Sequence, residues 1–185
     1  MPTVFSHAAV PLALGVGLGP RIVPPRLLAA GVLASALPDL DVIAFSWGVP
    51  YGSVLGHRGF THSLCAAAAV ALVGAALSRS LRAGAGRTVL FLFVAMASHG
   101  ILDAFTDGGR GVALLWPVSA ERFFAPAALR VLEASPIGLT RFLSTRGITV
   151  LESELRWIWL PALALCLILI GARRAWSGPH HGGHA

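Results

Sequence analysis

The acidic and imidazole side chains of this 185-residue chain gather into a few short clusters. All four aspartates, and every histidine before the last six positions, sit at an end of an apolar segment. They are His7; Asp39 and Asp41; His57 and His62; and His99, Asp103 and Asp107. Placing such ionisable groups at the ends of membrane-length helices costs free energy, so they are expected there only if they bind a metal or transfer protons. The segregation therefore predicts a metal site embedded in a membrane.

The strongest local signal is the pair His99 and Asp103, four residues apart on an expected helix. Residues at this spacing share one helix face, with Cβ atoms roughly 5–6 Å apart, so they can bind one metal or bridge two. Asp107 continues that face only if the helix persists, and Gly108 and Gly109 indicate an earlier end. Without the other clusters, a hydrogen-bonded His–Asp pair is an equally good interpretation.

Asp39 and Asp41 follow Pro38, which is expected to end a helix and to leave both in a non-helical turn. Two carboxylates at this spacing point different ways. One can bind a metal while the other orients a ligand histidine through its free ring N–H. We assign Asp39 as a metal ligand and Asp41 as a catalytic residue. Either Asp41 or Asp103 is the candidate proton acceptor.

The segment HRGFTHS contains His57 and His62, which are five residues apart and would diverge on a continuous helix. They can converge only if Gly59 lets the loop turn, and either histidine is a candidate ligand. Thr61 or Ser63 is expected to cap the helix that follows.

Arg58 lies between these histidines and offers a fork of donors that matches an anionic oxygen. We assign it to the catalytic group with Asp41 and Asp107; a snorkelling interfacial arginine is the alternative.

Mixed nitrogen and oxygen ligands suit Zn²⁺, Mn²⁺ or Fe²⁺, and the absence of cysteine ligands argues against a structural zinc site. The sequence has no G-x-S-x-G, H-E-x-x-H or glycine-rich phosphate loop. Hydrolysis by metal-activated water is the reaction class that remains, with zinc as the first choice.

Five apolar segments must position these groups, and each is helical by length and composition. They cover about residues 5–19, 26–37, 62–77, 88–105 and 157–171. A polar and aromatic loop is expected over 40–61, and an interfacial subdomain of short helices over 106–156. The predicted fold is one all-α domain over residues 1–176, a polytopic membrane bundle of four to five helices. The Gly- and His-rich tail, 177–185, is expected to be disordered.

The composition agrees with a membrane protein. The chain is 56% hydrophobic, and 12% of it is charged, against roughly 25% in typical soluble domains. Its mean hydropathy is +0.76.

All 14 positive charges are arginine, scattered without an aromatic stacking pattern, so nucleic-acid binding is not expected. Cys65 and Cys166 lie in apolar stretches, and no disulfide is expected. No basic residue precedes the first apolar run, so a cleaved signal peptide is not expected and His7 is retained.

Short basic regions predict the orientation in the membrane. They contain Arg21 and Arg26; Arg79, Arg82 and Arg87; and Arg173 and Arg174. Five spans would place these regions on one side, which the positive-inside rule makes the cytoplasm. All the histidine and aspartate clusters, His7 included, would then meet on the extracytoplasmic face.

Several motifs resemble, in order and spacing, those of the membrane-bound, LexA-regulated metal-dependent hydrolases of bacteria. They are His7, LPDLD at 37–41, HRGFTHS at 57–63, SHGILDAFTDGG at 98–109 and LLWPVSAERF at 114–123. The resemblance implies an inner-membrane hydrolase but no particular substrate. That family is distantly similar to the zinc-dependent phospholipase C and single-strand nuclease group. The resemblance implies that the metal ligands are His7, Asp39, His57 or His62, His99 and Asp103. The wider group holds three zinc ions through further His-rich motifs, and no histidine lies here between His99 and His180, so one or two ions are expected.

Three functions are compatible with such a site. The favoured one is hydrolysis of a phosphoester or similar bond, with the lipid bilayer as partner and a lipid or lipid-linked headgroup as substrate. An intramembrane metalloprotease is the second, and the missing H-E-x-x-H counts against it. A metal or proton transporter is the third, which predicts ionisable residues through the middle of the spans. The third and fifth apolar segments have none internally.

Overall fold

The computed structural model describes residues 1–136 and 139–176. Within these ranges the chain is helical and contains no β-strand, only two isolated bridges, Thr106 to Leu132 and Val112 to Phe123. The predicted all-α fold class is confirmed. The tail prediction falls on residues 177–185, which lie outside the described part of the chain.

The helices follow the predicted apolar segments closely. The N-terminal half contains α1 (Val4–His7), α2 (Ala9–Leu18), α3 (Pro25–Ala36), the 3-10 helices η1 (Leu37–Trp47) and η2 (Phe60–His62), and α4 (Leu64–Ala76). The C-terminal half contains α5 (Ala85–Ala104), η3 (Ala127–Leu129), α6 (Leu139–Phe142), α7 (Thr145–Glu154), the π-helical η4 (Leu155–Trp159) and α8 (Leu160–Trp176).

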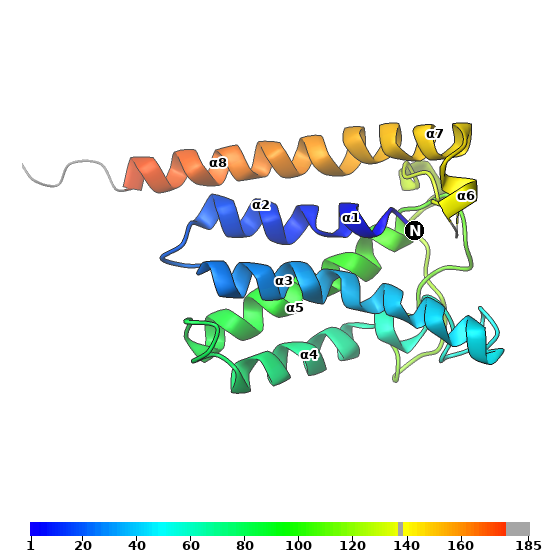
Figure 1. Cartoon of the computed structure of the whole chain (residues 1–185), viewed down its shortest axis with the longest axis horizontal. Coiled ribbons are helices and arrows are strands. Elements are labelled where there is room, and N and C mark those ends of the chain that lie inside the picture. Colours follow the sequence, from blue (N-terminus) through cyan, green and yellow to red (C-terminus); the bar gives the residue numbers. More distant parts are fainter. Residues whose placement is uncertain (137–138, 177–185) are drawn as a thin grey trace, which may run out of the picture.

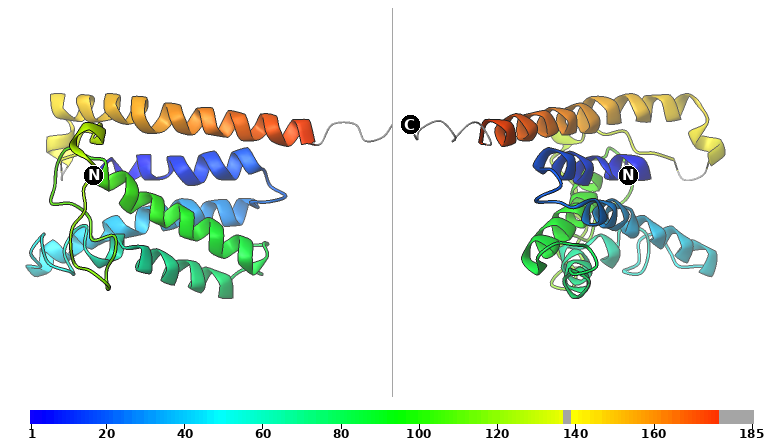
Figure 2. Two further views of the ribbon diagram at one scale, coloured as in Figure 1. Left: turned by 180° about the vertical axis from the view of Figure 1, so that it is seen from behind. Right: turned by 60° about the vertical axis from the view of Figure 1, so that its left-hand side comes forward.

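The long helices lie side by side in the order α8, α2, α3, α5 and α4 (Figure 1), and the same order is seen from behind in Figure 2. The core between α3, α4 and α5 is built from buried apolar side chains, including Leu27, Ala34, Ala71, Phe91 and Leu92. Within the described part of the chain, three helices are long and apolar enough to cross a membrane, Pro25–Trp47, Ala85–Ala104 and Thr145–Trp176. Val4–Leu18 and Leu64–Ala76 are shorter apolar helices. Only 6% of an 18-residue apolar window of the last candidate span is buried, so its exposed leucine surface suits contact with lipid.

Helix α3 ends at Ala36, close to the end expected before Pro38, but the chain beyond it stays helical. The chain continues from α3 into η1, and Pro38 occupies one of the first positions of η1, where its missing N–H costs no hydrogen bond. The following loop begins instead at Gly48, whose φ of 74° ends η1 in the left-handed conformation. Asp39 and Asp41 consequently lie on a helical turn, not in the non-helical turn that the sequence suggested.

The segment 106–156, for which an interfacial subdomain of short helices is expected, is not all irregular or in short helices. It includes an irregular segment with η3 and α6, but a helix begins at Thr145 and runs through η4 and α8 to Trp176. The π-helical turn ends just before Pro161, whose missing N–H removes one helical hydrogen bond, and this turn lets the helix continue past the proline. Residues 145–156 therefore belong to the final long helix.

Candidate metal centre

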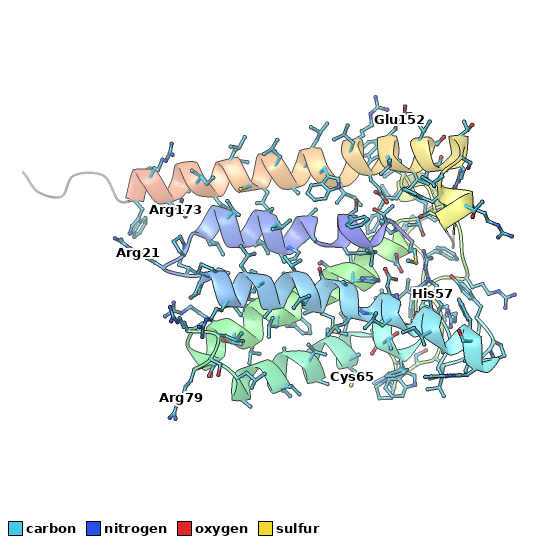
Figure 3. The ribbon with its side chains drawn as sticks, in the orientation of Figure 1. Arg21, His57, Cys65, Arg79, Glu152 and Arg173 are labelled. Atoms are coloured by element: carbon cyan, nitrogen blue, oxygen red, sulfur yellow. The ribbon has the colours of Figure 1, made fainter. Side chains whose placement is uncertain are left out.

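The predicted histidines and aspartates meet at one end of the bundle. Figure 3 labels His57 at that end and Arg21, Arg79 and Arg173 at the opposite end. The site is buried: His7, His99 and Asp103 are fully inaccessible, and Asp39 is 6% exposed. Groups from α1, η1, η2 and α5 form it, although these elements are far apart in the sequence.

Four donor atoms face one another at the centre of this cluster. They are Asp39 Oδ1, His62 Nε2, His99 Nε2 and Asp103 Oδ2, which we call the inner tetrad. The two Nε2 atoms are 3.1 Å apart. Asp39 Oδ1 lies 3.4 Å from His99 Nε2 and 3.8 Å from His62 Nε2. Asp103 Oδ2 lies 3.4 Å from His62 Nε2 and 3.9 Å from His99 Nε2. Zinc bonds of about 2.0–2.1 Å would set tetrahedral ligand atoms roughly 3.3–3.4 Å apart, so the tetrad is close to the size of a zinc site.

The outer nitrogens of the two tetrad imidazoles are already held. His99 Nδ1 donates to the backbone carbonyl of Ser35 at 2.7 Å, and a carbonyl can only accept. His62 Nδ1 lies 3.2 Å from Asp41 Oδ2 and 3.0 Å from Thr61 Oγ1. Both rings thus point Nε2 inwards, the orientation that outer-shell partners give to metal-ligating histidines.

Several buried polar atoms of the site have no hydrogen-bond partner among the described residues. They are both carboxylate oxygens of Asp39 and of Asp103, and both ring nitrogens of His7. Buried polar groups are almost always paired, so orphans in this number need an explanation. A divalent cation would give partners to these carboxylates and to one ring nitrogen of His7, and the donor set of imidazole nitrogen and carboxylate oxygen suits zinc, manganese or iron. The residues present therefore fit a metal.

Besides a metal, the Arg58 guanidinium brings positive charge to the tetrad, because its Nε lies 3.2 Å from Asp103 Oδ2, and protonation of His62 adds more. Burial lowers the pKa of His62, but the negative charges of the neighbouring Asp39 and Asp41 carboxylates outweigh burial and raise the pKa to about 9. In the metal-free protein a proton on His62 would therefore partly take the place of the cation.

Asp41 organises the histidines of HRGFTHS. Its Oδ1 lies 2.6 Å from His57 Nδ1, and its Oδ2 accepts from the Thr61 hydroxyl at 2.8 Å and from the Arg58 N–H at 3.3 Å. This is the orienting role expected for one of the two aspartates, and a proton-acceptor role for Asp41 stays a prediction. His57 contacts Asp41, whereas His62 faces the tetrad, although ligand atoms of Asp39, His57 and His62 all lie within 4.8 Å of one another.

Two glycines let the HRGFTHS loop approach α5. A Cβ on Gly100 would collide with the carbonyl oxygen of His62, so the residue after His99 must be small. Gly59 lies against the carbonyl of Val54, in the turn that brings the two histidines together as the sequence predicted. Ser63 caps α4 by accepting from the Ala66 N–H at 3.0 Å, which settles the choice of cap.

Arg58 is neither a snorkelling residue nor a donor open to substrate. It is fully buried, with a left-handed φ of 62°. Its Nε lies 3.2 Å from Asp103 Oδ2, and its other nitrogens donate to the Thr106 hydroxyl and the Gly108 carbonyl, each at 3.0 Å. The left-handed backbone costs on the order of 1–3 kcal/mol, which these contacts offset. The expectation of a free anion clamp is corrected: Arg58 holds Asp103.

Asp107 is the predicted site residue that the structure does not bring into the cluster. Helix α5 ends at Ala104, so Asp107 has left the face that carries His99 and Asp103. Its carboxylate accepts from the Ala134 N–H at 2.7 Å and lies 3.6 Å from Arg146, and its side chain is 43% exposed. This placement corrects the assignment of Asp107 to the site.

His7 completes the cluster from α1. Its ring stacks on that of His99, with centroids 3.5 Å apart and planes 12° apart, and its Nε2 lies 3.8 Å from Asp103 Oδ1. His7, His99 and Asp103 form a second group whose ligand atoms lie within 4.8 Å of one another. The structure thus brings together all six predicted ligands.

Glu154 is a residue that the sequence analysis missed. It is 1% exposed and accepts from the backbone N–H and hydroxyl of Thr3 and from the hydroxyl of Ser6. The Ser6 hydroxyl in turn accepts from Trp159 Nε1 at 2.9 Å. These contacts fasten the segment just before His7 to the last long helix. The available signal was an acid that directly precedes the strongly apolar run LRWIWL.

Comparisons with known proteins agree with a membrane location. The family model described as "YdjM inner membrane protein" matches residues 1–177. The chain is 51% identical over 175 residues to "Inner membrane protein YbcI" of Escherichia coli (strain K12), covering 94% of this chain and 100% of that protein. No solved structure matches.

Proposed function

Since the chain belongs to the YdjM inner membrane protein family, we propose that it is a membrane-bound metal-dependent hydrolase that uses the inner tetrad. The observation that carries the proposal is the convergence of four buried donor atoms, in which each of the two imidazole nitrogens lies 3.1 to 3.9 Å from the other and from both carboxylate oxygens. A divalent metal, with zinc as first choice, would supply Lewis acidity and lower the pKa of a water molecule. A second ion would use His7 Nε2 and Asp103 Oδ1, which are 3.8 Å apart.

The other residues of the cluster hold these ligands in place. Asp41 and the carbonyl of Ser35 fix the two tetrad imidazoles, and Arg58 holds Asp103. Such outer contacts keep each ring in the tautomer that a metal needs. Preorganised catalysis requires metal ligands whose orientation is fixed by hydrogen bonds to neighbouring residues.

An apolar groove next to the tetrad supports a lipid or lipid-linked phosphoester as substrate. Its volume is about 390 Å³, and its lining includes Phe60, Ala69 and Trp116. Thr61 also lines the groove, and its hydroxyl donates to Asp41. A hydrocarbon chain in the groove would hold its headgroup beside the metal ligands.

Hydrolysis assays on the purified, metal-loaded protein test the proposal. A long-chain phospholipid and a water-soluble phosphoester are offered beside a peptide substrate. Wild type is expected to release headgroup from the phospholipid, and His99→Ala to lose at least about a hundredfold of that rate, within the range seen when a key catalytic group is removed. Peptide cleavage without phosphoester cleavage would favour a metalloprotease. Turnover of none of these substrates would reject the hydrolase proposal.

The groove has its own control within the same assay. Ala69→Phe fills the groove, whereas Ala76→Phe makes the same change two turns further along α4, outside the groove lining. Only Ala69→Phe is expected to slow turnover of the long-chain substrate, and neither variant should slow the soluble one.

A further inference from the structure

The end of the bundle opposite the metal centre carries a large excess of positive charge. Seven of the 14 arginines belong to the segments that form it, namely Arg21, Arg26, Arg79, Arg82, Arg87, Arg173 and Arg174. Residues 9–38, 64–102 and 155–185 contain no Asp or Glu. Arg21, Arg79 and Arg173 are labelled together at this end in Figure 3. These segments therefore supply no carboxylate side chain of their own to balance the arginines.

A cavity lies within this basic end. Its volume is about 320 Å³, and it is lined by the α2–α3 turn, with Leu18, Arg21 and Ile22, and by Arg173 and Arg174 at the end of α8. The packing of α8 beside α2 brings these two remote parts of the chain together.

The turn between α2 and α3 leaves space for the guanidinium group of Arg173. Arg173 Nη1 donates to the Val16 carbonyl at 3.4 Å and passes directly over Gly19. A Cβ at Gly19 would collide with that guanidinium, and the φ of 81° at Gly19 is itself unfavourable for other residues. The backbone thus leaves room for Arg173 at the mouth of the cavity.

We propose that this cavity binds the phosphate headgroup of an anionic phospholipid. Guanidinium groups match phosphate oxygens in a bidentate way, and arginines near a membrane surface attract anionic lipids. Leu18 and Ile22 offer an apolar surface to the adjoining part of the lipid. The site is distinct from the metal centre and does not depend on any hydrolytic activity.

Native mass spectrometry of the full chain, with phosphatidylglycerol and phosphatidylcholine of equal chain length, tests the proposal. Wild type is expected to retain phosphatidylglycerol about tenfold more strongly. The double variant Arg21→Gln, Arg174→Gln should lose this preference. The double variant Arg79→Gln, Arg82→Gln is the control, because it removes the same charge from the same end but from residues that do not line the cavity.

Three results would overturn the proposal. They are an absence of preference in wild type, an equal loss in both double variants, and displacement of the lipid by millimolar inorganic phosphate, which would indicate a free-anion site. If the glutamine pair does not fold, Arg21→Lys, Arg174→Lys replaces it. That pair keeps the charge but loses the planar fork, so a reduced preference supports the proposal and an unchanged one contradicts it.

Discussion

His62 Nε2 and His99 Nε2 lie 3.1 Å apart, and both rings are fixed from behind through Nδ1. While His62 is protonated, its Nε2 can donate to His99 Nε2, but once that proton is lost the two nitrogens repel each other unless a cation lies between or beside them. Neutral imidazole nitrogens are common metal ligands, so this pair would suit the divalent ion that we propose. Gly100 makes the approach possible, because it leaves room for the carbonyl of His62 against α5.

Gly100→Ala should therefore separate the two histidines without removing any ligand. We expect metal affinity to fall by about tenfold or more, as when an outer contact of a metal ligand is lost. Gly86→Ala is the matched control, since it lies on the same helix with no atom near its added Cβ. Metal titration of both variants makes the comparison, and wild-type affinity in Gly100→Ala would show that the approach of η2 to α5 does not matter.

Asp41→Asn should weaken metal binding although Asp41 is outside the tetrad. The amide cannot accept from both His57 and His62 as the carboxylate does, so the His62 ring loses its orientation. The expected loss in affinity is about 10- to 100-fold. Asp107→Asn should bind metal like wild type, because that carboxylate faces Ala134 and Arg146. Equal losses in the two variants would contradict the assigned roles.

Metal affinity should depend on pH through His62. The pKa of His62 in the folded, metal-free protein is about 9, above its ordinary value of 6.5, because of Asp39 and Asp41. The proton stabilises the metal-free fold fully below pH 6.5, and this contribution is lost as the pH rises through 9. A metal must displace that proton, so affinity should rise by up to about tenfold per pH unit until pH 9. Calorimetric titration between pH 6.5 and 9, in buffers of different ionisation enthalpy, measures the proton release; binding without proton release would contradict this account.

Glu154→Ala should destabilise the fold and loosen His7. The change leaves the donors of Thr3 and Ser6 without their buried acceptor, at roughly 1–3 kcal/mol for each unsatisfied group. Glu152→Ala is the control, because that side chain is exposed on the same helix. The melting temperature and the number of metal ions bound per protein should both fall in Glu154→Ala. Neither should fall in Glu152→Ala. An unaltered melting temperature would show that Glu154 does not fasten the N-terminal segment.

Local spacing predicted well which candidate ligands would lie side by side where one helix carries them. His99 and Asp103 lie on the same face of α5, as the four-residue spacing requires. The basic links likewise predicted that the clusters would meet at the end of the bundle opposite the arginines. The choice of His62 over His57 for the tetrad was not predictable, because it depends on the contact between η2 and Gly100, which are remote in sequence.

The errors have identifiable physical causes. Pro38 looked like a helix stop, but at the beginning of a 3-10 helix its missing N–H costs nothing. Arg58 looked like an open anion clamp, and its left-handed backbone turns the guanidinium inwards, onto Asp103. The role of Glu154 rests on Thr3 and Ser6 at the far end of the chain, so no local pattern could reveal it.

X-ray absorption spectroscopy of the metal-loaded protein tests the central claim most directly. The account predicts a nitrogen and oxygen shell at about 2.0–2.1 Å that contains two imidazoles, with His99→Ala losing one of them together with most of the bound metal. A protein that binds no divalent metal, or a shell containing sulfur from Cys65 or Cys166, would contradict it.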